Sequence, residues 1–354
     1  MKSHIIHFLD PSLNIERICD DHVSLTYTEE FAGAGDFMCV LSLGAGYVPS
    51  VGDFVLCDGR LLYVVDSVAR DTGAGTVKIT GRGALSLLSR RIIPNTSGAY
   101  GRCDSLARTY INRYGLDALP APVGFVLDNN APMYSGTVNA GSLLEALEGL
   151  SSPWKRGISL DYSPLTGRFT FSMKAKRDRR LGSESDFDAV FLAENFGTLT
   201  FAKSTFDKSR YANSVTVRGA EKDDGTHYSV TVDAADMDFP DSFDDSASEV
   251  REGYVASGIG VGIYTTRDEN NVPDFDEEAY LDALRMRGRQ YLAVHRPTLT
   301  VEAGISPECA ADIVPGDVCT LCSDAWDGNS ATVIKKICKI EDGTATYFAE
   351  FDAL

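Results

Sequence analysis

The sequence lacks long hydrophobic runs. The longest apolar stretches of its 354 residues, such as Leu61 to Val65, are far shorter than the ~20 residues that a membrane-spanning helix needs. The segment that follows Lys2 is too short and too polar for the apolar core of a signal peptide. The sequence therefore predicts no stable membrane insertion and shows no export signal.

Positive charge is also scarce. The chain has 33 Lys and Arg residues against 51 Asp and Glu residues, a formal net charge of −18. A protein that reads DNA sequence needs basic side chains against the phosphates. The charge therefore argues against sequence-specific nucleic-acid binding.

Cysteine is too sparse for a disulfide scaffold. The chain has eight cysteines, and most of them, like Cys39, lie in alternating apolar segments, which predicts buried thiols in a reducing compartment. Cys319 and Cys322 form a lone Cys-x-x-Cys pair. Residues three apart on a strand point to opposite faces, so this pair does not predict a zinc site.

The usual catalytic motifs are missing as well. The sequence contains no Gly-x-Ser-x-Gly, no His-Glu-x-x-His and no phosphate-binding loop, and its five histidines are scattered. We therefore expect no enzyme activity, no catalytic residues, no metal and no cofactor.

What the chain does contain is a succession of short strands. Segments rich in Val, Ile, Thr, Tyr and Phe, separated by Gly- and Asp-bearing turns, predict antiparallel sheet or barrel structure over residues 23–28, 36–43, 51–57, 61–68 and 76–80. Helical spacing appears at 103–115, at 142–150 and, longest, at 275–294. The sequence predicts a mainly β chain with α+β insertions. The predicted domains are a first β-barrel at 1–95, an α+β domain at 96–205, and a second β-barrel at 206–354 that carries an acidic loop (221–249) and the long helix.

An internal repeat is the most informative feature of the sequence. A proline, a Gly-Asp pair, an alternating strand, an Asp-Gly turn and a returning strand occur near residue 50 and again near residue 316. Asp-Gly tolerates the positive φ of a tight hairpin, and Gly-Asp starts a strand after a bend. Two copies with matching hairpins suggest two related barrels; the alternative is a coincidence of common turn chemistry. The candidate turn residues are Gly52, Asp53, Asp58, Gly59, Gly316, Asp317, Asp327 and Gly328.

Two charged segments are candidate interaction sites. The acidic segment between Glu221 and Glu249 is typical of a solvated loop, with calcium binding or docking to a basic partner as alternatives. The basic segment after Lys174 is typical of a surface turn that can pair with an acidic neighbour. The candidate residues are Asp236, Asp238, Asp241, Asp244, Asp245, Lys176, Arg177, Arg179 and Arg180.

Several segments resemble one family. Residues 24–28, 33–43 and 81–93 resemble the N-terminal part of siphophage tail baseplate-hub proteins, the tail-associated proteins at the tail tip. Residues 210–219 and 281–292, followed by the strand 298–303, are similar to later parts of the same proteins. The resemblance spans most of the chain in order and rests mainly on hydrophobic pattern with a few Gly, Asn and Arg residues.

The resemblance implies a virion structural protein with two related β-barrels and smaller α+β domains. It implies a homotrimer, in which three chains with two barrels each form a pseudo-sixfold ring that lets DNA pass. The implied partners are the distal tail or tail tube protein, the tape-measure protein and a central fibre or receptor-binding protein. The implied location is the virion tail tip, with host cytoplasm during assembly. The alternatives are a hub of a related contractile injection apparatus and a glycan-binding or peptidoglycan hydrolase module of a tail.

Overall fold

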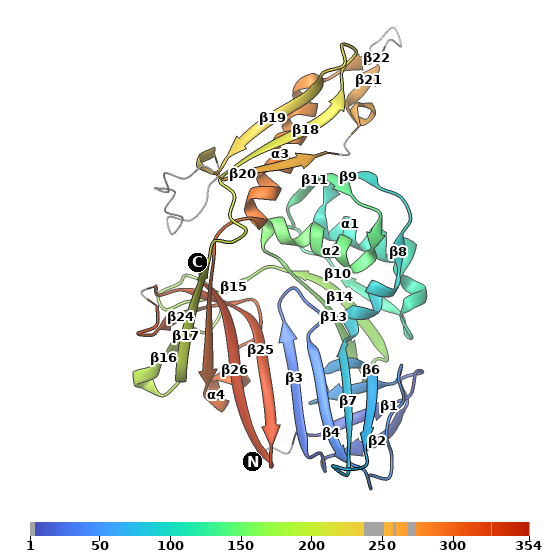
Figure 1. Cartoon of the computed structure of the whole chain (residues 1–354), viewed down its shortest axis with the longest axis vertical. Coiled ribbons are helices and arrows are strands. Elements are labelled where there is room, and N and C mark those ends of the chain that lie inside the picture. Colours follow the sequence, from blue (N-terminus) through green and yellow to red (C-terminus); the bar gives the residue numbers. More distant parts are fainter. Residues whose placement is uncertain (1–3, 237–250, 258–259, 268–272, 327, 354) are drawn as a thin grey trace.

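The computed structural model describes residues 4–236, 251–257, 260–267, 273–326 and 328–353. The described residues build one large sheet of 14 strands together with smaller sheets. In Figure 1 the large sheet forms the lower part of the molecule, a helical part lies above its first half, and a module with the helix α3 (Glu277–Val294) stands at the top. The prediction of a mainly β chain with α+β insertions is confirmed.

The first half of the large sheet is a unit of five antiparallel strands, hereafter the first unit. Across the sheet its order is β3 (Ser24–Glu30), β4 (Asp36–Ser42), β7 (Thr76–Gly83), β6 (Leu61–Asp71) and β5 (Phe54–Cys57). Beyond β5 the sheet continues with β1 (Ile6–Leu9) and β2 (Ile15–Cys19). Alternate residues such as Leu25, Cys39 and Val65 form a buried core, as the two-residue period of a sheet with one buried face requires.

The second half repeats this order with other strands, hereafter the second unit. The strands that correspond to β3, β4, β7, β6 and β5 are β17 (Leu199–Asp207), β23 (Thr298–Ile305), β26 (Thr344–Ala353), β25 (Ala331–Glu341) and β24 (Asp317–Cys322). Two short strands, β15 (Arg177–Arg179) and β16 (Phe191–Ala193), pair in parallel with β24. The helix α4 (Pro307–Asp312) contributes Ala310 to a separate core with Leu321 and Phe351.

The two units join edge to edge. β25 pairs with β3, from Lys335 opposite Glu30 to Glu341 opposite Ser24. The two predicted barrels thus correspond to two units that have separate cores and share one continuous sheet; closure of each unit into a barrel stays a prediction. The two-residue period of the strands could not predict this pairing, because it shows which face is buried and not which strand lies beside it.

A mixed α+β part follows the first unit in the chain. Its helices are α1 (Cys103–Tyr110), which continues in π-helical form to Gly115, and α2 (Leu143–Ser151), close to the predicted ranges. Its strands are β8 (Ile92–Ile93), β9 (Ser97–Arg102), β10 (Val123–Val126), β11 (Met133–Val138), β12 (Gly141–Ser142), β13 (Gly157–Ser163) and β14 (Arg168–Lys174). A 3-10 helix, η1 (Ala84–Arg90), packs with both helices onto the outward face of β5 and β6, where Leu56 and Leu62 share a core with Leu88 and Leu147.

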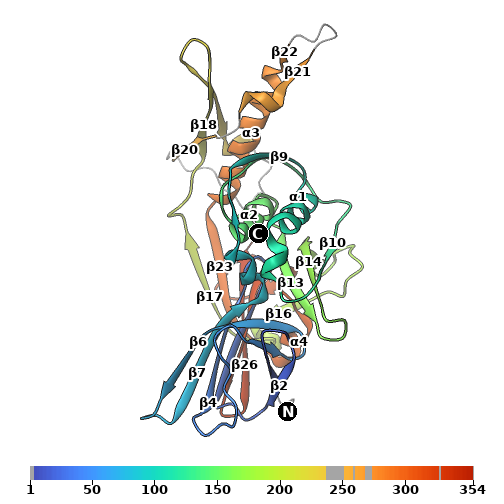
Figure 2. The same ribbon diagram turned by 90° about the vertical axis from the view of Figure 1, so that its right-hand side faces the viewer.

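The module at the top interrupts the second unit between β17 and β23 (Figure 2). Its strands are β18 (Ser214–Glu221), β19 (His227–Asp233), β20 (Glu252–Ala256), β21 (Thr265–Arg267) and β22 (Pro273–Phe275). The predicted long helix is α3, which packs Tyr280 and Leu284 against Val215 and Val232. The predicted division at 1–95, 96–205 and 206–354 stays a prediction.

An aspartate side chain caps the N-terminus of α3. Asp276 is the N-cap, and its Oδ1 accepts a hydrogen bond of 2.9 Å from the backbone N–H of Ala279. Asp276→Ala should lower the free energy of unfolding by about 1 kcal/mol, because one N-terminal N–H of the helix loses its acceptor. Urea denaturation followed by circular dichroism measures the loss. Asp276→Ser keeps a capping oxygen, and an equal loss in both variants would contradict the capping role.

Candidate functional site

The two repeated segments build the same turn in both units. Gly52 and Gly316 have φ values of +96° and +100°, a backbone conformation that favours glycine. The N–H of Gly52 donates to the Val65 carbonyl at 2.9 Å, and the N–H of Gly316 donates to the Val333 carbonyl at 2.7 Å. The turn leads the chain into β5 in one unit and into β24 in the other.

The aspartate after each glycine closes the turn in the same way. The side chain of Asp53 accepts a hydrogen bond of 2.7 Å from the N–H of Ser50, and Asp317 accepts one of 3.0 Å from the N–H of Val314. In return, the backbone N–H of Asp53 donates to the Ser50 carbonyl and that of Asp317 donates to the Val314 carbonyl, both at 3.1 Å. The repeat is therefore present in backbone hydrogen bonds as well as in sequence.

The second turn lies where three parts of the chain meet. Phe31, at the end of β3, donates its N–H to Ile334 of β25 at 2.9 Å, and its carbonyl accepts the N–H of Ile158 of β13 at 2.9 Å. A Cβ on Gly316 would lie 2.5 Å from the Phe31 ring, and one on Gly157 would lie 2.4 Å from it. Both glycines are thus required for the close approach of this ring.

The basic segment predicted as a surface turn forms internal ion pairs at this joint. Asp317 is fully buried and accepts hydrogen bonds from Arg177 Nε at 2.6 Å and from Arg179 Nη1 at 3.2 Å. Arg179 also forms a two-bond pair with Asp312, with both contacts at 2.9 Å. Burial opposes the charged form of Arg179, but the bonds to Asp312 and Asp317 outweigh it and raise its pKa.

The two remaining residues of the basic segment also have partners in the chain. Lys176 Nζ donates to Thr332 Oγ1 at 2.9 Å, and burial lowers the pKa of Lys176. Arg180 pairs with the neighbouring Asp178, with the shorter contact at 2.6 Å. The structure therefore joins Arg177 and Arg179 to the repeat residue Asp317, although the sequence pattern predicts no relation between them.

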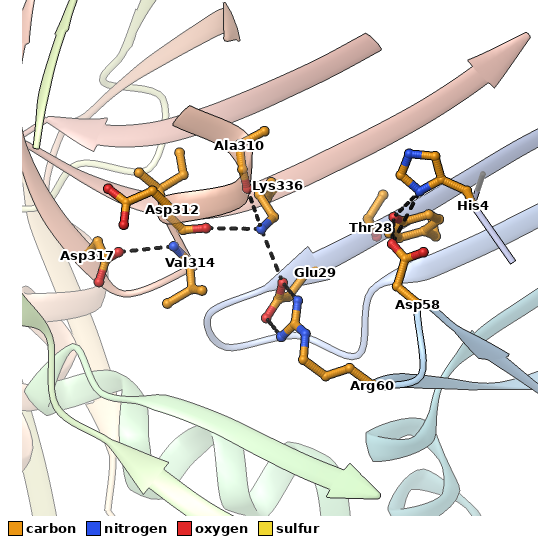
Figure 3. Close-up of polar contacts among 12 residues, drawn as sticks. His4, Thr28, Glu29, Asp58, Arg60, Ala310, Asp312, Val314, Asp317 and Lys336 are labelled. Atoms are coloured by element: carbon orange, nitrogen blue, oxygen red, sulfur yellow. Dashed lines mark hydrogen bonds and ion pairs between the residues drawn. The ribbon is translucent and has the colours of Figure 1, made fainter. Parts of the chain in front are cut away.

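A second polar network crosses the seam between β3 and β25 (Figure 3). Lys336 Nζ donates to the carbonyls of Ala310 at 3.1 Å and Ile313 at 3.0 Å, and it lies 3.7 Å from Glu29. Arg60 holds both oxygens of Glu29 at 2.7 Å. Burial raises the pKa of Glu29, but the bonds to Arg60 and the nearby positive charges outweigh it and hold this pKa low.

The predicted Asp58–Gly59 turn carries a third contact between the units. Both residues have positive φ, +50° and +66°. Asp58 accepts a hydrogen bond from the Tyr27 hydroxyl and lies 3.3 Å from His4 Nδ1 (Figure 3 shows His4 and Asp58). The other ring nitrogen, His4 Nε2, lies 3.0 Å from the hydroxyl of Tyr347 in β26. Burial raises the pKa of Asp58, but its bonds to His4 and Tyr27 outweigh this and lower it.

The other predicted site residues are not brought together. Asp236 ends a short 3-10 turn after β19, while Asp238, Asp241, Asp244, Asp245 and Asp327 lie outside the described residues. Gly328 lies beside the Trp326 ring. Within the described ranges, no group of His, Cys, Asp or Glu has the arrangement of a metal site. No helix in the described part of the chain is long and apolar enough to cross a membrane.

The joint borders a cavity of about 500 Å³ between the ends of β3 and β6, the strands β13 and β14, and the Gly316 turn. Three pairs of oppositely charged side chains line it: Arg60 with Glu29, Arg156 with Asp128, and Lys174 with Asp161. Two further lining residues, Arg177 and Glu30, pair with Asp317 and Lys335 just outside the lining. Opposite charges held in pairs fix the relative positions of the elements that carry them. The arrangement can therefore hold three parts of the chain together.

Sequence reasoning missed Phe31, His4 and the seam residues. A signal for the seam exists in the sequence: the charge doublet Glu29-Glu30 in one strand is complementary to Lys335-Lys336 in another. Opposite charges on facing strands stabilise a pairing. Phe31 and His4 have no comparable signal.

The pKa of Lys155 is lower than that of an ordinary lysine. Burial, and then the positive charges of Arg296 and Lys176, lower the pKa of Lys155 to about 8, although Asp352 opposes the shift. The Arg296 Nη2 lies 2.7 Å from Asp352, so the carboxylate is already paired. The folded chain therefore holds a proton on Lys155 less strongly than the unfolded chain does.

Lys155→Met should remove a pH dependence of stability. Between pH 8 and 10.5, the folded and ordinary pKa values of Lys155, the unfolded state binds more protons, so the free energy of unfolding rises with pH. The variant should be more stable than the wild type at pH 7 and should show a flatter profile over this range. Urea denaturation at several pH values measures both. Parallel profiles would contradict the assignment.

Gly316→Ala and Gly52→Ala form a matched pair. Both place Ala at nearly the same positive φ, at a cost of about 1 kcal/mol. A Cβ at Gly52 meets nothing within 4 Å, whereas one at Gly316 meets Phe31. Overpacking should therefore lower the free energy of unfolding of Gly316→Ala by a further ~1–3 kcal/mol. Urea denaturation of the two variants measures the difference. Equal losses would show that the Phe31 contact does not restrain the joint.

Solved structures of other proteins share this fold. No protein-family model and no curated protein matches the sequence. Among solved structures, the tail protein from Neisseria meningitidis MC58 has a TM-score of 0.60 at 14% identity, covering 99% of this chain and 96% of that chain. The 43 kDa tail protein of prophage MuSo2 from Shewanella oneidensis has a TM-score of 0.60 at 11% identity, covering 99% of both chains. The prophage tail protein gp18 from Listeria monocytogenes EGD-e has a TM-score of 0.58 at 11% identity, covering 99% of this chain and 94% of that chain. The chain therefore has the fold of these tail proteins, as its resemblance to tail-hub proteins predicted.

Proposed function

We propose that this chain is a structural hub protein of a phage tail tip, and that three copies form a ring that connects the tail tube to the host-recognition machinery. The observation that carries the proposal is the pair of units with one strand order, β3-β4-β7-β6-β5 and β17-β23-β26-β25-β24. Three chains with two such units present six similar surfaces. A closed ring of this kind satisfies every head-to-tail contact and can meet a sixfold tube.

The fold supports the proposal from a second direction. The similar solved structures are tail proteins, and the similarity runs over nearly the whole of this chain. The proposed partners are the distal tail or tube protein, the tape-measure protein and a central fibre or receptor-binding protein. The proposed location is the virion tail tip, after assembly in the host cytoplasm. The proposed role requires no enzyme activity and no cofactor.

The proposed wall of the passage is the face of the large sheet opposite the two cores, outside the part of β5 and β6 that the helices cover. Residues that alternate with core positions lie on this face, among them Glu30, Glu302 and Glu350, and Lys335 on the same face pairs with Glu30 at 3.2 Å. With a chain charge of −18, an acidic wall would repel the phosphates of passing DNA. Salt screens this repulsion beyond about 10 Å at 0.1 M, so only charges near the passage contribute.

The ring can be tested with the purified full-length chain. Light scattering should give a mass three times the 38.3 kDa of one chain, because two units per chain need three chains to make six positions. Electron microscopy of the particles should show a ring with the open sheet face toward its centre. An obligate dimer, or a ring with this face outside, would contradict the proposal.

A further inference from the structure

In the described part of the chain, each unit has a strand edge that no other strand pairs with. Within the described residues, β17 pairs only with β23. β6 pairs with β5 over Leu61–Val64 and with β7 over Tyr63–Asp71, so the edge of Ser67–Asp71 on the β5 side is open. Open edges carry unpaired N–H and C=O groups and can pair with another chain.

The chain itself shows how such an edge is filled. β25 corresponds to β6, and its outer part, Lys335–Glu341, pairs beyond the end of β24 with β3. β3 in turn corresponds to β17. The seam between the units is therefore a contact between the same two kinds of edge that are open elsewhere in the chain.

The bulges in the two units set the correspondence of β6 with β25. The pairing of β6 with β7 shifts register between Val65 and Ser67, and that of β25 with β26 shifts between Val333 and Lys335. The glycine turns described above donate to Val65 and Val333 in both units. Ser67 therefore corresponds to Lys335.

The partners across each sheet set the correspondence of β17 with β3. Across the paired strands β6, β7, β4 and β3 of the first unit, the residues that face one another are Val65, Gly81, Phe37 and Tyr27. Across β25, β26, β23 and β17 of the second unit, they are Val333, Phe351, Val301 and Ser204. Ser204 therefore corresponds to Tyr27, and Asp207 corresponds to Glu30.

We propose that Ser67–Asp71 of one copy pairs antiparallel with Lys203–Asp207 of the next copy, in the register of the β25–β3 seam. In this register Val68 lies opposite Phe206, Ala69 opposite Thr205, and Asp71 opposite Lys203. This inference rests on the proposed ring and names the strands that close it.

The chemistry of the two edges fits this register. Phe206 is 61% exposed in the single chain and would contact Val68 of the neighbouring copy. At the same position in the internal seam, Glu29 faces Lys336, so the proposed contact has an apolar pair where the seam has a charged one. Asp71 and Lys203 place opposite charges face to face. Val68 is half-buried against the first core, and the other residues of both edges are exposed in the chain alone.

The space beside Gly52 supports the same contact. Phe31, which follows Glu30, fills the space at Gly316, while nothing lies within 4 Å of a Cβ on Gly52. The residue that follows Asp207 is Lys208. In the proposed ring Lys208 of the next copy takes the place at Gly52 that Phe31 takes at Gly316.

Disulfide cross-linking tests the register in the full-length chain. Ala69→Cys with Thr205→Cys, in a Cys322→Ser background that removes the exposed native thiol, should give covalent trimers on non-reducing gels, since directly opposed residues lie within disulfide reach. The matched control is Ala69→Cys with Ser204→Cys. One residue out of register, its thiols point to opposite faces and should not cross-link.

A surface substitution tests the same edge without cysteines. Phe206→Asp should weaken trimer formation at least tenfold by light scattering and leave the melting temperature of the monomer unchanged. Tyr254→Asp, at a residue 59% exposed on β20 and away from both edges, is the control and should leave the trimer intact.

The outcomes separate the two proposals. Trimers that resist Phe206→Asp and cross-link in neither or in both registers would overturn these edges and leave the hub standing. A chain that forms neither trimers nor cross-links would overturn both.

Discussion

The ring of Phe31 packs directly against Gly157 and Gly316 and so ties the first unit to the α+β part and to the second unit. The ring approaches both glycines more closely than any Cβ would allow, and the backbone of the same residue bonds to β25 and to β13. One residue at the end of β3 thus fixes the second unit and the α+β part against the first unit. Because close-packed interiors transmit small displacements, a change at this point would move elements that lie far apart in the sequence.

The duplicated turn shows how one local structure acquires two environments. Asp53 and Asp317 close their turns with the same backbone bonds, but Asp317 is fully buried and paired with Arg177 and Arg179. A buried carboxylate needs such partners, because the cost of removing its charge from water must be offset. The arginines come from β15, which pairs with β24; in the first unit, antiparallel β1 occupies that position beside β5.

The same comparison explains how two units can match in the sheet and differ elsewhere. β3 and β4 are joined by a short connection, whereas β17 and β23 are separated by the whole module that contains α3. A long insertion in a connection adds little to the entropy of closing it, so the sheet tolerates the module. What the sheet keeps constant is strand order, bulge position and the glycine turn, and these are the features that a ring of similar surfaces needs.

Features that depend on neighbouring residues could be predicted from the amino-acid sequence. Alternation and turn chemistry gave the mainly β character, the Gly-Asp and Asp-Gly pairs marked turns that adopt positive φ at Gly52, Asp58 and Gly316, and helical spacing gave α3 to within two residues of its start. Which strands and charges meet depends on the tertiary structure. Arg177 and Arg179 resembled a surface turn because their partner Asp317 lies 140 and 138 residues away, and the two units share a sheet because β3 pairs with β25. A local pattern records which side of a strand is apolar, but the identity of its neighbour depends on contacts between distant segments that no local pattern contains.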